Sequence, residues 1–311
     1  MITQQQIGDF DAKLRKILGV NVPDVPLAPK IESEETVGDV KRMLVRYDVA
    51  DGERIGAYLL IPLAQTPQDL PAIMAIHQHG GNFKLGKSEP AGLSDNPTFH
   101  YGLDLAKRGY VVLCPDQLAF EERVPSPNEA DDWNERFEAT RLFMEGSSLQ
   151  AKYVADLVKG LDYLCSLPFV NSNRIGCIGH SLGGQETLWL TWFDSRIKAA
   201  ASSCGFAMMS AIVRERINHN MAIYVPGFLT IGDVDMIAAA ISPRPFLFTA
   251  GNLDGIFPID SVRHIAQFAK AVYSQAGATE NTQYVEFDGA HGFPDDVKKQ
   301  AYEFLDKHLK T

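Results

Sequence analysis

The sequence has no long hydrophobic run and no paired cysteine motif. A membrane-spanning helix needs about eighteen consecutive apolar residues, and the sequence contains no run of that length. We therefore expect no membrane partner. The segment from Met1 to Gln6 has neither the basic nor the apolar part of a signal peptide, which favours a cytoplasmic, reducing location. The absence of a C-x-x-C pair removes the strongest zinc and thioredoxin signals, and we expect buried thiols at the four cysteines, Cys114, Cys165, Cys177 and Cys204.

Basic residues are outnumbered by acidic ones. The chain carries 29 Lys and Arg against 39 Asp and Glu, for a formal net charge of -10. Such a mean field repels phosphate backbones, so nucleic acid is not an expected partner. Hydrophobic residues at 45% and charged residues at 22% are typical of a globular protein and exclude disorder as the main state. The 311 residues could form one large domain or two average ones.

The N-terminal part differs from the remainder of the chain. Residues 1–40 combine a short amphipathic stretch, Phe10 to Leu18, with three prolines, and we expect an arm packed on the main domain. The β-rich segments 41–49 and 54–61 then flank Asp51 and Gly52, a combination that predicts an antiparallel hairpin.

The rest of the chain alternates short apolar runs with helical periodicity. Continuous apolar runs suit strands covered on both faces, as in a parallel sheet. Helical spacing of apolar residues recurs over 154–164, 262–272 and 297–305. The pattern predicts one α/β domain over residues 41–311, with helices on both faces of a mostly parallel central sheet. Its predicted parallel strands are 72–76, 111–114, 174–178, 197–202, 246–250 and 283–287.

Two segments interrupt this alternation, residues 117–146 and residues 205–245. Both follow predicted strands and lie near their carboxyl ends. Ligands of open α/β sheets bind outside those ends, so these segments are expected to form walls of the pocket.

A G-x-S-x-G pattern, Gly179 to Gly183, follows the predicted strand 174–178 and precedes a helix that starts near Gln185. Glycines two residues on either side of a serine allow a sharp turn from strand to helix, which exposes the serine hydroxyl. The string alone is a weak signal, and its position between strand and helix makes it a strong one. It predicts that Ser181 is a nucleophile.

A serine hydroxyl needs a base to take its proton and a carboxylate to hold that base. Asp254 follows the predicted strand 246–250, and His291 follows the predicted strand 283–287. Both therefore fall at the sheet edge that presents Ser181, in the order serine, acid, histidine that this kind of site requires.

Other acids were compared with Asp254. Asp288 lies only three residues before His291, in the same loop, and ranks well below Asp254. Asp260 follows Pro258 and is better explained as a residue at the start of a helix.

The chemistry also needs two backbone N–H groups that face the developing oxyanion. The loop His79-Gly80-Gly81-Asn82 follows the predicted strand 72–76, so Gly81 is the expected first donor and Asn82 the fallback. Leu182, directly after the nucleophile, is the expected second donor.

No metal or organic cofactor is expected. His77 and His79 form an H-x-H pair, but no Cys or carboxylate stands nearby at ligand spacing. His180 can be a packing neighbour or line the pocket, and we assign it with Asn82 to the substrate-binding residues. The tryptophans after Ser181 are more typical of a core.

Together these motifs resemble the α/β-hydrolase superfamily over about residues 41–310, and within it the dienelactone-hydrolase-like or acetyl-xylan-esterase-like branch. Supporting segments are 115–116, 120–123, 242–245 and 256–258. The resemblance implies Ser181 as nucleophile, His291 as general base, Asp254 as orienting acid, and Leu182 with Gly81 as oxyanion donors.

Two positions depart from this branch. Dienelactone hydrolases proper use a cysteine nucleophile where this chain has Ser181, and related acetyl xylan esterases carry a glutamine where it has Leu182. The resemblance therefore does not extend to dienelactone or sugar acetates as substrates.

The sequence thus predicts a serine carboxylesterase that cleaves a small-molecule ester, with short-chain acyl or acetyl esters favoured, through an acyl-enzyme. The same triad could cut a peptide or thioester bond. A ligand-binding protein without activity could also keep this scaffold, although such a protein commonly loses the histidine base. Oligomeric state and the natural alcohol stay open.

Overall fold

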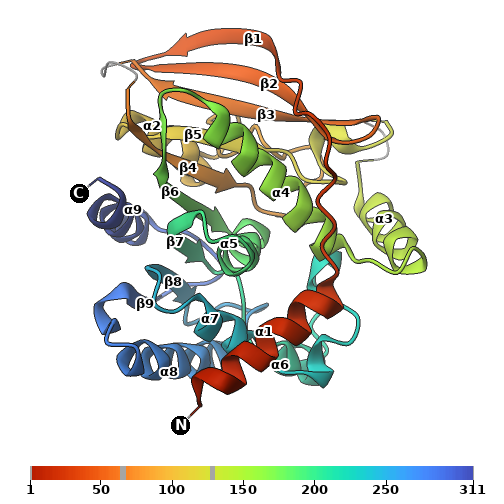
Figure 1. The fold of residues 1–311 in the computed structure, drawn as a ribbon, viewed down its shortest axis with the longest axis vertical. Coiled ribbons are helices and arrows are strands. Elements are labelled where there is room, and N and C mark those ends of the chain that lie inside the picture. The colour runs from red at the N-terminus through yellow and green to blue at the C-terminus, as the bar shows by residue number, and fades with distance from the viewer. Residues whose placement is uncertain (1, 64–67, 127–129, 311) are drawn as a thin grey trace.

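The computed structural model describes residues 2–63, 68–126 and 130–310. A single nine-stranded sheet forms the centre of the molecule, in the order β1-β2-β3-β5-β4-β6-β7-β8-β9, and helices cover both of its faces (Figure 1). The strands are β1 (Lys30–Val37), β2 (Val40–Ala50), β3 (Glu53–Pro62), β4 (Leu70–Ile76), β5 (Val111–Pro115), β6 (Val170–His180), β7 (Ile197–Ser203), β8 (Phe246–Gly251) and β9 (Thr282–Phe287).

The helices divide between the two sheet faces. Apolar side chains of α1, α4, α5, α7 and α8 share one core cluster, whereas those of α2 and α9 share a second cluster on the other face. The helices are α1 (Gln4–Leu18), α2 (Tyr101–Lys107), α3 (Asp132–Met144), α4 (Leu149–Ser166), α5 (Leu182–Phe193), α6 (Met209–Glu215), α7 (Val234–Ile241), α8 (Ile259–Gln275) and α9 (Asp295–Leu309).

The pairing confirms the predicted mixture of strand directions. The pairs β1–β2, β2–β3 and β3–β5 are antiparallel. The pairs β5–β4, β4–β6, β6–β7, β7–β8 and β8–β9 are parallel. The parallel strands are apolar because both faces are covered: β4, β5 and β8 are buried along their whole length. Their carboxyl ends share one edge of the sheet.

Strand β1 was not predicted, because residues 30–37 had been assigned to the arm. It is almost wholly exposed and has no apolar alternation. Its contacts with β2 are backbone pairing and ion pairs, among them Lys41 with Glu34 at 2.9 Å and Arg42 with Glu35 at 2.9 Å. Charged side chains on an edge strand also discourage pairing with other chains.

Helix α1 begins with a capping box, in which Thr3 and Gln6 bind each other's backbone N–H groups. It buries a stripe of four residues against the body of the protein and lies beside α7 (Figure 1). Asp11 accepts a 2.8 Å hydrogen bond from the indole of Trp192 on α5. The buried stripe consists of Ile7, Phe10, Leu14 and Leu18.

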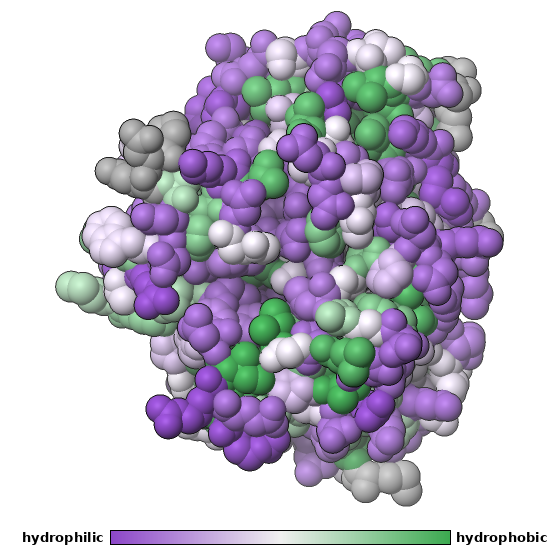
Figure 2. Space-filling model, turned by 180° about the vertical axis from the view of Figure 1, so that it is seen from behind, coloured by the Kyte–Doolittle hydropathy of each residue, from purple (hydrophilic) through white to green (hydrophobic). Residues whose placement is uncertain are grey.

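The face of the molecule shown in Figure 2 is mainly hydrophilic, with separated hydrophobic patches. Within residues 2–63, 68–126 and 130–310, no single helix is long and apolar enough to cross a membrane. One bent pair, Met221–Thr230 with Val234–Ile241, meets those criteria jointly, by length and composition alone. In the predicted pocket-forming segment 117–146, residues 127–129 lie outside the described part of the chain.

Candidate active site

Ser181 stands at a sharp turn between β6 and α5. Its backbone lies in the left-handed region, with φ 56° and ψ -121°. Non-glycine residues rarely adopt positive φ, and such strain persists only where the surroundings enforce it. Here the Ser181 N–H donates to Ser203 O of β7 at 2.9 Å, and Ser181 O accepts from Gln185 N at 2.9 Å.

The flanking glycines make this turn possible. A Cβ on Gly179 would collide with the backbone of Gly183, and a Cβ on Gly183 would collide with the carbonyl oxygen of Ile76 on β4. Gly184 is equally crowded by the backbone of Ser203 and Gly205. The glycines of the motif therefore serve a close approach of α5 to the sheet.

Asp254 and His291 meet at the carboxyl ends of β8 and β9. His291 Nδ1 lies 2.7 Å from Asp254 Oδ2, and Asp254 Oδ1 accepts from the N–H groups of Ile256 at 3.0 Å and Phe257 at 3.2 Å. Burial opposes ionisation of this carboxyl, but the hydrogen bonds and the charge of His291 outweigh it and lower the pKa of Asp254. The acid is an anion that holds the histidine.

Two hydrogen bonds connect the loop after β8, which carries Asp254, to the loop after β9, which carries His291. Leu253 N donates to Gly289 O at 2.9 Å, and Gly289 N donates to the side chain of Asn252 at 3.1 Å. The two loops are thereby fixed in relation to each other, which sets the direction of the His291 ring.

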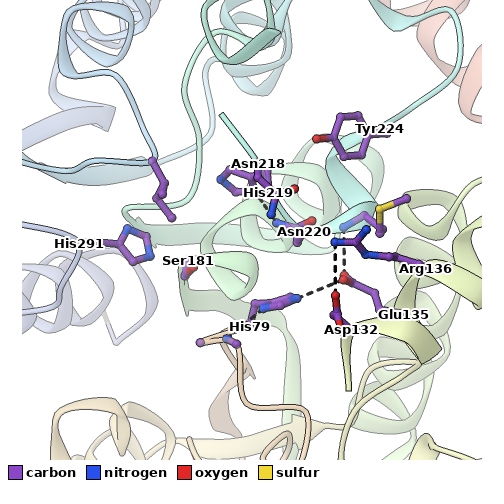
Figure 3. Close-up of a pocket in the computed structure, with 14 residues that line it drawn as sticks. His79, Asp132, Glu135, Arg136, Ser181, Asn218, His219, Asn220, Tyr224 and His291 are labelled. Atoms are coloured by element: carbon purple, nitrogen blue, oxygen red, sulfur yellow. Dashed lines mark hydrogen bonds and ion pairs between the residues drawn. The ribbon is translucent and has the colours of Figure 1, made fainter. Parts of the chain in front are cut away.

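His291 Nε2 is buried and has no hydrogen-bond partner in the described part of the chain. It is thus not hydrogen-bonded to the Ser181 hydroxyl in this structure, although both residues line the same cavity of about 720 Å³ (Figure 3). Catalytic hydrogen bonds are often long in unliganded enzymes and tighten only with substrate.

The two expected oxyanion donors differ in their surroundings. Leu182 opens α5, and the first N–H groups of a helix have no partner within it. Gly81 has a positive φ of 66° and donates its N–H to His79 Nδ1 at 3.1 Å. His79 Nε2 in turn lies 3.3 Å from Glu135 Oε2 on α3. The Gly81 N–H therefore already has an acceptor.

The two expected substrate-binding residues, Asn82 and His180, do not line this cavity. Asn82 is exposed, its N–H donates to His79 O at 3.1 Å, and its side chain accepts from Lys84 N at 3.2 Å, so it stabilises a turn. His180 is fully buried, with its ring centroid 4.8 Å from that of His291 and its Nδ1 3.0 Å from Ser203 Oγ. It packs behind His291 because the strand side chains alternate between faces.

Much of the cavity wall comes from the two segments that interrupt the α/β alternation. Glu135 of α3 is 3% exposed and accepts from Met221 N at 3.0 Å, which connects the two segments (Figure 3). These polar wall residues carry no motif, so the sequence does not predict them. They are Asp132, Glu135, Arg136, Asn218, His219, Asn220 and Tyr224.

Neither histidine of the H-x-H pair has a free ring nitrogen. His77 Nε2 accepts from Gln117 N at 3.2 Å and its Nδ1 lies 2.8 Å from Gln78 O, while His79 contacts Gly81 and Glu135. Cys204, Asp254 and His291 have potential ligand atoms within 4.8 Å of one another. Burial raises the pKa of the Cys204 thiol to about 11, and metals bind the thiolate, so this set fits a metal ion poorly.

The fold and the comparisons define the class of this protein. Its mostly parallel sheet with an antiparallel N-terminal part is that of the α/β-hydrolases. The family model of the dienelactone hydrolase family matches residues 55–304, and the chain belongs to that family.

Three known proteins illustrate the relationship. The curated protein "Putative hydrolase YtaP" of Bacillus subtilis is 29% identical over 281 residues, which cover 89% of this chain and 90% of that protein. A solved structure named "putative acetyl xylan esterase" from Bacteroides fragilis has a TM-score of 0.76 at 18% identity and covers 96% of this chain and 81% of its own. A glucuronoyl esterase from Solibacter usitatus has a TM-score of 0.70 at 16% identity, with 98% and 92% covered.

Proposed function

We propose that this member of the dienelactone hydrolase family is a serine carboxylesterase, with Ser181 as nucleophile, His291 as general base and Asp254 as orienting acid. The observation that carries the proposal is the 2.7 Å hydrogen bond between His291 Nδ1 and the buried Asp254 Oδ2, because His291 lines the same cavity as the strained Ser181. The ionised Asp254 accepts from Nδ1, so the imidazole proton resides there. Nε2 keeps its lone pair and can take a proton.

The proposed reaction has two acyl transfers. Ser181 Oγ forms a bond to the ester carbonyl carbon while His291 Nε2 takes the hydroxyl proton. The carbon–oxygen bond to the alcohol breaks as His291 returns that proton to the leaving oxygen, which leaves an acyl-enzyme. Water then repeats both steps and releases the carboxylic acid, so protons and atoms balance without a cofactor.

The proposed oxyanion hole combines the N–H groups of Leu182 and Gly81. Leu182 N–H is available at the first turn of α5. Gly81 N–H exchanges His79 Nδ1 for the substrate oxygen, because an oxyanion is a stronger acceptor than a neutral imidazole nitrogen.

Short-chain acyl or acetyl esters are the proposed substrates. The cavity of about 720 Å³ has polar side chains from both wall segments near Ser181, which suits a small acyl group better than a long hydrocarbon chain. The name of one similar solved structure, acetyl xylan esterase, points in the same direction.

The proposal is tested by hydrolysis of p-nitrophenyl esters of increasing acyl length, together with an acetylated sugar and a thioester. Wild type is expected to prefer short acyl esters, and Ser181→Ala is expected to lose about a thousand-fold or more in kcat while its thermal unfolding stays cooperative. Ser210→Ala, at an exposed serine of α6, is the matched control. Substantial turnover by Ser181→Ala would refute the assignment, and preference for the thioester would redefine the leaving group.

A further inference from the structure

His219 lines the cavity, and its ring nitrogen Nε2 has no hydrogen-bond partner within residues 2–63, 68–126 and 130–310. It shares the cavity with Ser181 and His291, and its Nε2 is buried without a hydrogen-bond partner. In Figure 3 its ring lies between Asn220 and the side of the cavity where Ser181 and His291 stand. A buried polar atom without a partner costs about 1–3 kcal/mol, so this nitrogen calls for an explanation.

Asn220 determines which nitrogen of His219 carries the proton. The Asn220 Oδ1 accepts from the N–H of Ile223 at 3.2 Å, which orients the amide group. The Asn220 Nδ2, a donor only, then lies 2.9 Å from His219 Nδ1. His219 Nδ1 must therefore be an acceptor, and the proton lies on Nε2.

A buried chain of side chains locks this arrangement behind the nucleophile. Asn220 Nδ2 also donates to Gln185 Oε1 at 3.1 Å, Gln185 Nε2 donates to Gln150 Oε1 at 2.7 Å, and Gln150 Nε2 donates to Glu186 Oε2 at 2.7 Å. All four residues are buried. Each amide NH₂ group in this chain donates to the next side chain toward Glu186. No amide can therefore rotate by half a turn without breaking a hydrogen bond to its neighbour.

The environment also keeps the His219 ring uncharged. Burial, aided by the nearby His291 and His79, lowers the pKa of His219 to about 4, against a smaller opposing effect of Asp254. Its ring packs on Phe257 with centroids 4.7 Å apart. At neutral pH His219 therefore keeps a fixed N–H donor in the wall of the cavity, and it has no free lone pair with which to act as a base.

We propose that His219 Nε2–H donates a hydrogen bond to an oxygen of the substrate outside the scissile ester group. The site would then select esters with a neighbouring hydroxyl or ether oxygen over hydrocarbon esters of the same shape. The physical reason is that a hydrocarbon in this position leaves a desolvated N–H unpaired, whereas an oxygen pairs it. This inference rests on the proposed esterase function and names its substrate class.

The test uses two pairs of esters in which one CH₂ group is replaced by oxygen. On the acyl side these are p-nitrophenyl methoxyacetate and p-nitrophenyl butyrate, and on the alcohol side 2-methoxyethyl acetate and butyl acetate. For each pair the ratio of kcat/KM, oxygenated over hydrocarbon ester, is measured in wild type, His219→Phe and His219→Gln. His264→Phe, at an exposed histidine on α8, is the matched control.

His219→Phe keeps a ring against Phe257 but has no donor, so its ratio is expected to fall about ten-fold in at least one pair. His219→Gln carries an amide N–H near the position of Nε2 and is expected to restore much of the ratio. Asn220→Asp places an acceptor opposite Nδ1, which moves the proton away from Nε2, and is expected to lower the ratio with His219 in place. His264→Phe should leave it unchanged.

Unchanged ratios in both pairs for folded His219→Phe, or for Asn220→Asp should His219→Phe fail to fold, would overturn the inference. So would an equal fall in His264→Phe. Wild type that hydrolyses none of the four esters would instead contradict the esterase proposal itself, whereas an active wild type with unchanged ratios contradicts only the role of His219. Ser181→Ala, measured beside wild type, shows that the hydrolysis comes from this site.

Discussion

Backbone crowding at three glycines explains the sequence of the turn around Ser181, the proposed nucleophile. Gly179, Gly183 and Gly184 each face backbone atoms of neighbouring strands or turns where a Cβ would stand. Such contacts cannot relax by rotating a side chain, so these positions admit only glycine. The pattern was predictable because strand, turn and helix lie within one stretch of chain, whereas the crowding of Gly183 by β4 and of Gly184 by Ser203 and Gly205 appears only in the folded chain.

Gly183→Ala is therefore expected to destabilise the protein by at least about 2 kcal/mol, since the methyl group would overlap Ile76 O. Gly8→Ala is the matched control, because Gly8 is an exposed residue of α1 with nothing within 4 Å of its would-be Cβ. Alanine there should raise the free energy of unfolding by about 0.5–1 kcal/mol. Urea denaturation of both variants measures the difference, and equal effects would contradict this account of the elbow.

The limits of sequence reasoning are also visible at single residues. Ser181, Asp254 and His291 could be proposed because each follows a predicted strand, and parallel strands share one carboxyl edge. The position of His180 could not be predicted, since it depends on which sheet face the last residue of β6 turns to. The proposed role of His219 could not be predicted either, because it depends on Asn220, whose orientation follows from side-chain contacts with distant residues of α5 and α4.

At the scale of elements, the hydrophobic pattern was most informative for buried strands. All six predicted parallel strands are present. Burial on both faces explains the continuous apolar runs of β4, β5 and β8, whereas β9 at the edge of the sheet is partly exposed. Strand β1 lacks that signal: its side chains are exposed and charged, and it is held by pairing with β2. Helix α3 likewise has no clear signal in the sequence, and its part in the cavity wall is seen only from the contacts of Glu135 with His79 and Met221.

Helix α3 is expected to position the oxyanion loop through Glu135. Glu135→Gln keeps an oxygen for Met221 N but presents an N–H to His79, which breaks the His79 contact that holds Gly81. The expected result is a fall in kcat of about ten-fold with a smaller change in KM, because an oxyanion donor acts in the transition state. Steady-state kinetics on a short acyl ester measures this, and a change confined to KM would speak against a link between α3 and the oxyanion loop.

The segment after β4 contains a buried carboxyl whose titration should be visible in stability. Burial raises the pKa of Glu89 to about 7 from its ordinary value of 4.5, against a smaller effect of its 3.0 Å hydrogen bond from Gln78. The pKa of Glu89 is therefore higher in the folded state than in the unfolded state. Its contribution to the free energy of unfolding is fully present at pH values below the unfolded-state pKa, and it is lost as the pH rises through the folded-state pKa.

Glu89→Gln should remove that loss. Between about pH 4.5 and pH 7 the free energy of unfolding should fall less steeply in the variant than in wild type, by up to about 3 kcal/mol over the interval. Urea denaturation at a series of pH values measures both slopes. Parallel curves for the two proteins would show that Glu89 is ionised in the folded state.

At the scale of the whole molecule, the N-terminal helix is part of the main core. Leu14 is fully buried and Phe10 nearly so, within the same cluster as residues of α4, α5, α7 and α8 (Figure 1). Arg15 stacks over Trp192 with 4.9 Å from its guanidinium carbon to the ring centroid. These contacts join the first helix to the helix that begins at Leu182, directly after the proposed nucleophile Ser181.

Leu14→Ala is accordingly expected to lower the free energy of unfolding by about 2–5 kcal/mol, because it leaves a cavity in the shared core. Lys13→Ala, at the exposed neighbouring position, should change it by less than about 0.5 kcal/mol. The expected unfolding curve for Leu14→Ala is one cooperative transition at lower urea concentration. A separate early transition would show that α1 unfolds independently.

Ser181 as the nucleophile is tested most directly by labelling with a fluorophosphonate, followed by mass spectrometry of the digested protein. One covalent adduct is predicted, on the peptide that contains Ser181, with little labelling in His291→Ala and none at this site in Ser181→Ala. An adduct on another residue, or no adduct in a wild-type protein that hydrolyses esters, would contradict the account.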